Sequence, residues 1–188
     1  MASPSFEIML GRARHPLVLA LAVGSTASRG AIYDANGSPV RPRAKVPHAF
    51  TTRADGTSII DPDQIVREVT QLIDQLVDLT VGHPVAAVSL DTFASSLVGV
   101  DAQGAAVTPC FNYNDNRCAD EVALLRAEVD EDRIQALTGC RFHASYLPAR
   151  LRWLARTEPA TVATVTRWMS LGEYVWLRLL GDTAGYVT

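Results

Sequence analysis

A short run of small and hydroxyl-bearing residues, GSTASR, separates two apolar stretches near the start of the chain. Gly24 lets the backbone approach a ligand closely, and the N–H groups of Ser25 and Thr26 can converge on an anion. Arg29 adds a cationic donor nearby. These residue types suit a phosphate-binding turn, and they are equally ordinary in a hairpin that binds nothing. The run is not a Walker loop, because the GxxxxGK spacing and the helix that follows it are absent.

Two later segments carry further residues that could contact a ligand. Asp91, Thr92 and Phe93 directly follow an apolar run, and their role is taken from the family resemblance given below. Asp115 and Arg117 stand two positions apart in the segment NYNDNRC. This pair can either contact a substrate or lock its own loop through a charge-assisted hydrogen bond. The residues alone leave both interpretations open.

The elements around the first turn are predicted to be strands. Residues 17–23, 30–34 and 40–46 have high β-propensity, and Asn36 with Gly37 supplies a tight turn between the second and the third. The three strands should form an antiparallel meander. The turn that contains Gly24 then lies at the first bend of this meander.

A long helix and a further strand are predicted next. Residues 61–81 begin with Asp61 as N-cap, Pro62 at the first helical position and Gln64 completing a capping box. The apolar residues that follow fall on one helical face. The continuous apolar run 84–90 suits a strand buried on both faces. A strand, a helix and a strand in this order favour a crossover connection with parallel pairing.

The second half of the chain changes character. A hairpin with its turn at residues 101–104 is expected first. Beyond residue 115 the pattern is mainly helical, with helices predicted over 119–129, 131–137, 146–156 and 170–181. The last helix opens with Ser170 and Glu173 as a capping box and ends at Gly181.

The last helix carries more apolar side chains than one stripe can bury. Tyr174, Trp176 and Leu180 lie off the four-residue stripe that begins at Leu171. These three side chains need a second neighbour or another subunit. A homodimer is therefore among the partners we expect.

Size and composition exclude several classes of protein. The 188 residues, 48% of them hydrophobic, suffice for one domain or a tightly joined pair. The net charge of −3 comes from interspersed acids and bases, which argues against binding to nucleic acid or to anionic lipid. No run approaches the roughly 18 apolar residues of a membrane span. Residues 1–16 have no clear period and are expected to form a loose leader before ordered structure begins near residue 17.

The cysteines indicate a reducing compartment. Cys110, Cys118 and Cys140 are odd in number and include no CxxC pair, so neither a disulfide framework nor a common zinc site is predicted. We expect a cytoplasmic protein. The arginines at 12 and 14 followed by an apolar run imitate a signal peptide, but that run is at the short limit for one.

Four segments in order resemble the FGGY carbohydrate kinases, which phosphorylate sugars and polyols. The first hairpin is similar to the family's strand, Asp-x-Gly-Thr/Ser-Thr/Ser turn and second strand with Lys or Arg. The segment VAAVSLDTFASSLVGVDAQGAAVTP resembles its strand and substrate-facing turn, and NYNDNRCADE its aromatic-x-Asp-x-Arg segment. The stretch from TGCRFHASYLPARLRW to LRLLGD looks like its helical portion. The likeness spans about residues 17–182, and the amino-acid sequence near Asp91 most resembles the gluconate kinase and xylulose kinase side of the family.

The resemblance implies an α/β fold of the actin-like, ribonuclease H-like kind, with a mixed sheet and a helical C-terminal portion. Residues 17–188 would be the N-terminal, sugar-binding domain of an ATP-dependent kinase acting on a hydroxyl of a sugar, sugar acid or polyol, with ATP and Mg²⁺ as cofactors. Gly24, Ser25, Thr26 and Arg29 would bind phosphate. Asp91, Thr92, Phe93, Asp115 and Arg117 would face the substrate.

The chain also departs from the family pattern. Ala22 stands where the family has the loop aspartate, and a methyl group cannot hold a metal or its water. Ala94 and Ser95 stand where relatives on the gluconate kinase side of the family tend to have a bulky aromatic residue and a histidine. The second domain, which supplies the family's catalytic base and adenine-binding elements, is missing, so the chain is expected to be incomplete for catalysis and to carry no catalytic residue. The abrupt end favours a truncated chain.

A second hypothesis follows from these departures. A degenerate, non-catalytic relative would bind a sugar or a partner protein without transferring phosphate, and Ala22 favours it. A third class, another ribonuclease H-like module, is disfavoured on different grounds, because a two-metal nuclease needs several converging carboxylates and the first strand has none.

Overall fold

The computed structural model describes residues 7–181, which form two compact units. Among the described residues, unit 1 comprises 7–49 and 63–92, and unit 2 comprises 50–62 and 93–181. Each unit is built around its own sheet and its own buried side chains. We describe each unit by itself.

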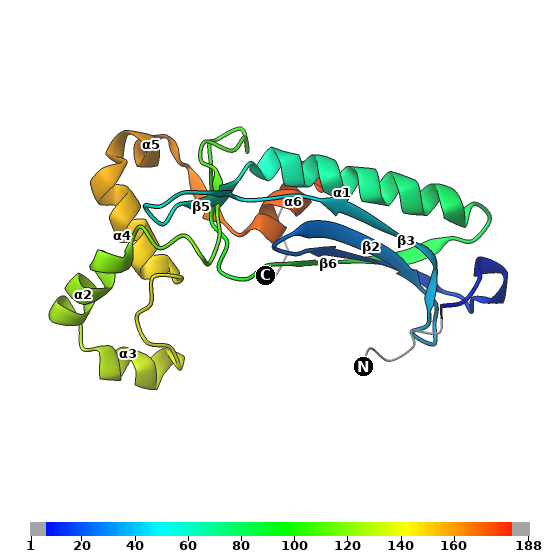
Figure 1. The fold of residues 1–188 in the computed structure, drawn as a ribbon, viewed down its shortest axis with the longest axis horizontal. Coiled ribbons are helices and arrows are strands. Elements are labelled where there is room, and N and C mark those ends of the chain that lie inside the picture. The colour runs from blue at the N-terminus through cyan, green and yellow to red at the C-terminus, as the bar shows by residue number, and fades with distance from the viewer. Residues whose placement is uncertain (1–6, 182–188) are drawn as a thin grey trace. The chain divides into compact units, whose positions relative to one another are not determined.

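Unit 1 is a four-stranded mixed sheet (Figure 1). β1 (Leu17–Val23), β2 (Ala27–Tyr33) and β3 (Pro39–Pro47) form the predicted antiparallel meander, and β6 (Val85–Thr92) pairs with β1 in parallel. The strand order is β3-β2-β1-β6. Both the meander and the parallel crossover predicted from the sequence are confirmed.

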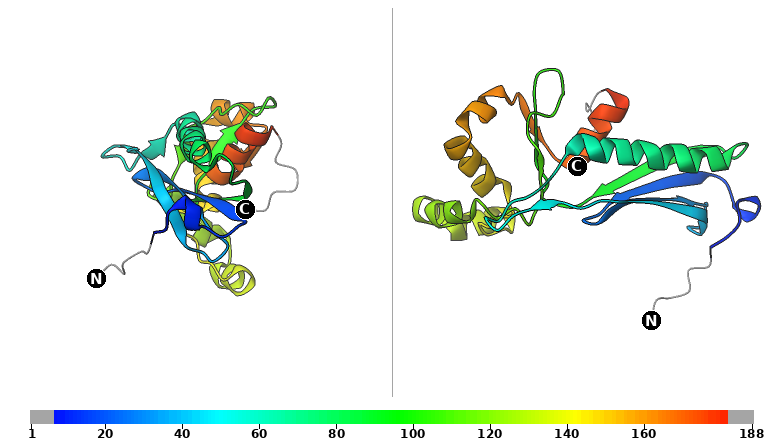
Figure 2. Two further views of the ribbon diagram at one scale, coloured as in Figure 1. Left: turned by 90° about the vertical axis from the view of Figure 1, so that its right-hand side faces the viewer. Right: turned by 45° about the horizontal axis from the view of Figure 1, so that its top comes forward.

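One face of this sheet is covered by α1 (Pro62–Val77), which continues into the short 3₁₀ helix η2 (Asp78–Thr80). Figure 2 shows the helix running alongside the strands. The helix buries the stripe Ile65, Val69, Leu72 and Leu76. At the centre of the contact, a Cβ on Gly30 would lie 2.6 Å from Leu76 Cδ1. The glycine therefore sets how closely the helix approaches β2.

The exposure of β6 differs from the sequence prediction. The apolar run was expected to be buried on both faces, yet Ala86, Ala87 and Ser89 are exposed and Val88 retains 44% of its surface. The position of β6 in the sheet explains this exposure. β6 is the outer strand of the sheet within the described part of the chain, so only its pairing with β1 is satisfied there.

The segment before β1 contacts the sheet. η1 (Leu10–Arg12) is a short 3₁₀ helix, and Ile8 pairs with Val40 through Ile8 N–H to Pro39 O and Arg41 N–H to Ile8 O, both 2.9 Å. Regular structure thus begins before residue 17, unlike the loose leader that the sequence suggested. Residues 1–6 of that leader lie outside the described residues.

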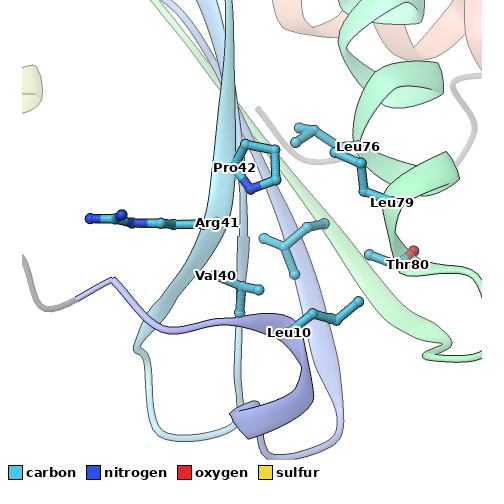
Figure 3. A pocket seen from close by; sticks show the side chains of 8 residues that line it. Leu10, Val40, Arg41, Pro42, Leu76, Leu79 and Thr80 are labelled. Carbon is cyan, nitrogen blue, oxygen red and sulfur yellow. The ribbon is translucent and has the colours of Figure 1, made fainter.

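Figure 3 shows why this segment is held in place. The side chains of Leu10, Val40 and Leu79 lie around the same space, while the side chain of Arg41 points away from it. These residues line a cavity of only about 10 Å³ at the end of α1. The apolar side chain of Leu10 closes the end of the unit 1 core.

Unit 2 contains short strands and most of the helices. One sheet has the order β4-β5-β8, and β7 pairs with β9. The strands are β4 (Thr51–Thr52), β5 (Ser58–Ile60), β7 (Val98–Val100), β8 (Cys110–Phe111) and β9 (Arg167–Met169). The helices are α2 (Ala119–Glu128), α3 (Glu131–Thr138), α4 (Leu147–Thr157), α5 (Pro159–Thr164) and α6 (Leu171–Leu180). Leu97, Phe111, Trp153 and Leu154 are among the core residues.

Several local predictions in unit 2 are confirmed. Asp101 Oδ1 accepts hydrogen bonds from Gln103 N–H and Ala105 N–H at the expected turn, both 2.9 Å. The capping box of Ser170 and Glu173 is present, and α6 ends at Gly181 with φ +76°. Because these signals act between neighbouring residues, they can be read from the sequence.

Other features of unit 2 were not predicted. β9 interrupts the stretch that was expected to be mainly helical, and it pairs with β7 although about 70 residues separate them. Tyr174 of α6 is fully buried, whereas Leu180 remains 56% exposed. The α/β class with a mixed sheet and a helical C-terminal portion is confirmed. Among the described residues no helix is long and apolar enough to cross a membrane.

Candidate functional site

The turn between β1 and β2 brings the first predicted group together. Gly24 N–H donates to Ala27 O at 3.0 Å and closes the turn. Ser25 and Thr26 are exposed at its tip, and Arg29 is exposed on β2. Small and hydroxyl residues suit this bend because they adapt to its tight backbone without burying polar groups. Gly24, Ser25, Thr26 and Arg29 therefore form one continuous surface.

Arg29 lies over the turn. Its Nη1 donates to Ala27 O at 3.4 Å, and its Nη2 donates to Thr26 Oγ1 at 3.5 Å. A Cβ on Gly24 would lie 3.1 Å from Nη1 of Arg29. Gly24 thus leaves room for the guanidinium. The long distances leave most of the donor capacity of Arg29 available to an anion.

The strand register places Asp91 beside the same turn. Ala22 pairs with Arg29 on one side and with Asp91 on the other, and Val23 pairs with Thr92. The three paired residues share the sheet face opposite α1, since side chains directly opposite each other point to the same side. Position 22 is therefore flanked by a guanidinium and a carboxylate, with only a methyl group between them.

An open pocket of about 500 Å³ extends over this sheet face. Its lining combines the small residue Ala22 with three cations, Arg29, Arg43 and Lys45, and with the carboxylate of Asp91. The small side chains keep the face hollow, and the cations make it favourable for an anion. All of these residues belong to unit 1.

A buried network that the sequence did not predict lies behind the turn. The side chain of His48 is fully buried, and its two ring nitrogens face Gly24 O at 2.9 Å and Glu68 Oε2 at 2.8 Å. Glu68 also accepts from Ser28 Oγ at 2.6 Å and from Gln64 Nε2 at 2.9 Å. A signal existed in the sequence, because Glu68 stands next to the apolar stripe of α1. Its partner His48 is 20 residues away and could be found only from the fold.

In unit 2 the predicted pair Asp115 and Arg117 forms one ion pair. Arg117 Nη2 donates to Asp115 Oδ2 at 2.7 Å, and Ser58 N–H donates to the same oxygen at 3.0 Å. Asp115 is 1% exposed, and the guanidinium of Arg117 lies 4.6 Å from the ring centroid of Trp153. Of the two interpretations left open by the sequence, the loop-locking bond is observed. Nothing in the structure tests a substrate contact.

Arg150 holds two loops of unit 2 in place, and it was not singled out from the sequence. This arginine is completely buried in α4. Its guanidinium donates to Ser95 O at 2.9 Å and Asn112 O at 2.8 Å, and more weakly to Asp115 O at 3.2 Å. Burial lowers the pKa of Arg150. It spans the loop that follows Phe93 and the loop of Asp115, so one side chain fixes both.

The cysteines offer no reactive centre among the described residues. Burial raises the pKa of Cys110 to about 12 and also raises that of Cys118, while Cys140 is exposed. No group of three or more metal-ligating side chains occurs in the part of the chain that the structure describes. The polar groups with functional potential are therefore the turn, the open sheet face and the loops fixed by Arg150.

Solved structures place this fold in a known class. The chain superposes on the gluconate kinase of Lactobacillus acidophilus with a TM-score of 0.79 and 24% identity, covering 89% of this chain and 34% of that one. For the xylulose kinase of Rhodospirillum rubrum the TM-score is 0.82 and the identity 25%, covering 86% and 33%. These proteins have the actin-like ATPase fold, so the fold class predicted from the sequence is confirmed.

The sequence comparisons then give the family. The N-terminal domain of the FGGY family of carbohydrate kinases matches residues 17–188, so the chain belongs to this family. Gluconokinase of Bacillus subtilis (strain 168) is 20% identical over 168 residues, and xylulose kinase of Escherichia coli (strain K12) is 27% identical over 124 residues. The alignments cover 88% and 66% of this chain. They cover 32% and 25% of those proteins, so the chain spans about a third or less of the relatives it matches.

Proposed function

We propose that this chain is the sugar-binding and phosphate-binding part of an ATP-dependent kinase that phosphorylates a hydroxyl of a sugar, a sugar acid or a polyol. The observation that supports it most is the register across β1. This register places Arg29 and Asp91 on either side of Ala22. Ala22 itself lies two residues before Gly24, at the end of β1 that leads into the turn. Groups for an anion and for a polar ligand thereby meet at the carboxyl ends of two parallel strands.

In this proposal Gly24, Ser25, Thr26 and Arg29 bind phosphate groups of ATP. Phosphoryl transfer depends on positioning and on balancing the charge of the phosphates, and backbone N–H groups with an arginine provide both. Asp91 is the carboxylate beside the turn. Mg²⁺ in such sites is held by one or two carboxylates together with phosphate oxygens. The residues present therefore fit a metal that arrives with the nucleotide, and that metal would neutralise phosphate charge.

Asp91, Thr92 and Phe93 are the residues we assign to the substrate side, while the ion pair of Asp115 and Arg117 holds its own loop. The carboxylate of Asp91 can accept hydrogen bonds from sugar hydroxyls, and it is exposed. Phe93 packs edge-on against Phe50 at 5.3 Å between ring centroids, which gives its loop an apolar wall. Ala94 and Ser95 are small, so the proposal expects more room for a substrate beside this loop than a bulky aromatic residue and a histidine would leave.

The proposal includes a second domain that supplies the catalytic base. A kinase of this type excludes water by closing two domains over its substrates, and one of them alone cannot do so. We also place the protein in the cytoplasm, because its three cysteines are free thiols. A homodimer remains a proposal for the exposed end of α6.

A second candidate is a non-catalytic relative that binds a sugar or a partner protein. It rests on Ala22, since a methyl group stands between Arg29 and Asp91 where an acid would serve metal-assisted transfer. In this alternative the turn keeps its shape and its anion-binding groups, while transfer is lost.

An activity assay separates the two candidates. The protein from the complete reading frame and its Ala22→Asp variant are incubated with Mg·ATP and a panel containing gluconate, xylulose and glycerol, and ATP consumption is measured. The kinase proposal expects sugar-dependent consumption, increased by Ala22→Asp. Sugar binding without ATP consumption by either protein supports the non-catalytic candidate. For residues 1–188 alone we expect the turn to bind polyphosphate only weakly, so ATP kept below its dissociation constant should give no measurable rise in Tm.

A further inference from the structure

His48 holds both ends of the Gly24 turn from inside unit 1. Its backbone N–H donates to Thr26 O at 3.1 Å, and its Nε2 lies 2.9 Å from Gly24 O. A carbonyl oxygen can only accept, so Nε2 must carry a hydrogen. The bond to the turn therefore requires a proton on Nε2 of His48.

The other ring nitrogen of His48 faces a carboxylate that already accepts on both oxygens. Glu68 Oε2 accepts a hydrogen bond from Ser28 Oγ and lies 2.8 Å from His48 Nδ1. Glu68 Oε1 accepts a hydrogen bond from Gln64 Nε2. An ionised carboxylate in this setting accepts from Nδ1 as well. Both ring nitrogens then donate, which makes His48 an imidazolium paired with a nearly buried Glu68.

The bond to Gly24 O fixes the direction of one peptide group. The Gly24–Ser25 peptide is trans, and in a trans peptide the C=O and the following N–H point in opposite directions. Because Gly24 O points inward to His48, the N–H of Ser25 points outward, toward the exposed tip of the turn. If this peptide flipped, a carbonyl oxygen would face an approaching anion and repel it.

We propose that His48 is a positioning residue of the turn: held as an imidazolium by Glu68, it fixes the Gly24–Ser25 peptide so that the Ser25 N–H is presented to a phosphate-type anion. His48 does not touch the ligand itself and acts through the backbone of Gly24. The proposal rests on the phosphate-binding role assigned to the turn above. Ser28 and Gln64 contribute by keeping the carboxylate of Glu68 in place.

The experiment uses NMR spectroscopy of the 188-residue chain with inorganic triphosphate as the probe. The ¹⁵N spectrum of the His48 ring should show both nitrogens protonated at neutral pH, and the Ser25 amide signal should shift on titration with triphosphate. In His48→Gln the affinity measured at Ser25 should fall about tenfold, the equivalent of one charge-assisted hydrogen bond. His143→Gln, an exposed-loop variant in unit 2, should change neither observable.

Glu68→Gln provides a second variant of nearly unchanged volume. Without the carboxylate, His48 should lose one ring proton, and the Ser25 amide should move even before triphosphate is added. A wild-type ring spectrum with one unprotonated nitrogen overturns the proposal without any variant. The proposal is also overturned if His48→Gln leaves the triphosphate affinity at Ser25 unchanged. The amides of β1 and β2 must remain protected from exchange in this variant, which shows that it is folded.

Failure of the proposed function gives a different result. If triphosphate shifts no amide of the turn in the wild-type chain, the phosphate assignment is wrong, and with it the ligand part of this inference. The protonation of His48 and the response of the Ser25 amide to Glu68→Gln still decide whether the histidine fixes the peptide.

Discussion

The turn in unit 1 and the Asp115 loop in unit 2 are held in a similar way but leave different groups available. Behind the turn, buried His48 bonds to Gly24 O and Thr26 O. Behind the Asp115 loop, buried Arg150 bonds to Asn112 O and Asp115 O. In both regions one residue from outside the irregular segment binds its carbonyl groups: His48 uses a ring nitrogen and its backbone N–H, whereas Arg150 uses its guanidinium.

The difference lies in the side chains of the two segments. Ser25 and Thr26 remain exposed at the tip of the turn, whereas Asp115 is buried and bound by Arg117 and Ser58. The turn therefore keeps its own polar groups for a ligand, and the loop uses its carboxylate to hold itself. The comparison teaches that a motif residue can serve the fold or the ligand, and that its burial and partners decide which role it has.

The largest effect is expected from Arg150→Met. The substitution leaves the carbonyls of Ser95, Asn112 and Asp115 without their buried donor, so the free energy of unfolding should fall by about 3 kcal/mol or more. All three tryptophans lie in unit 2, so their fluorescence during urea unfolding reports on this unit. Exposed Arg133→Met is the control and should change stability by less than about 0.5 kcal/mol. Equal effects of the two variants would contradict the role given to Arg150.

Gly30→Ala should produce the next largest effect, this time in unit 1. The added Cβ would lie 2.6 Å from Leu76 Cδ1 and 3.3 Å from Leu21 Cδ2, so the leucine side chains or α1 must shift at a cost of about 1–3 kcal/mol. Amide hydrogen exchange of β1 and β2 measures the loss. Gly11→Ala, where a Cβ meets nothing within 4 Å, should leave exchange unchanged. Unaltered exchange in Gly30→Ala would show that the helix does not pack as described.

Alkaline pH should weaken unit 2 through Cys110. Burial raises the pKa of this thiol from its usual value near 9 to about 12 in the folded chain. The unfolded chain therefore releases its proton first as the pH rises, and the stability present below pH 9 is lost progressively between pH 9 and 12. Comparison of urea unfolding in wild type and Cys110→Ala should show a shallower decline for the variant. Identical declines would mean that the thiol does not contribute.

The smallest effect is expected from Ser25→Ala. The side chain is exposed at the tip of the turn, so the free energy of unfolding should change by less than about 0.5 kcal/mol. Asp115→Asn is the matched variant in the other region, and it should cost more because the buried ion pair with Arg117 is weakened. A loss of stability in Ser25→Ala as large as that in Asp115→Asn would remove the distinction between the two regions.

Local chemistry made much of this fold readable from the sequence. The meander, the Asp101 turn and the cap of α6 depend on residues within a few positions of one another, and each is confirmed. The family resemblance, carried by four short segments in order, is confirmed for residues 17–188. Gly24, Ser25, Thr26 and Arg29 lie together at the turn because they are neighbours along the chain, and their phosphate-binding role stays a prediction.

Contacts between distant residues were not readable in this way. The pairing of β7 with β9, the exposure of β6 and the burial of Arg150 all depend on which element lies against which, and no local pattern encodes that. The same holds for Asp91 beside Ala22, which follows from the register of two strands about 70 residues apart.

The sequence by itself determined the strands, the main helices, the small and polar character of the Gly24 turn, and the absence of an acid at position 22. Only the tertiary structure decided that His48 and Glu68 stand behind this turn and that Asp115 is buried. The physical reason is that hydrogen bonding and burial act through space, while propensity and capping act along the chain.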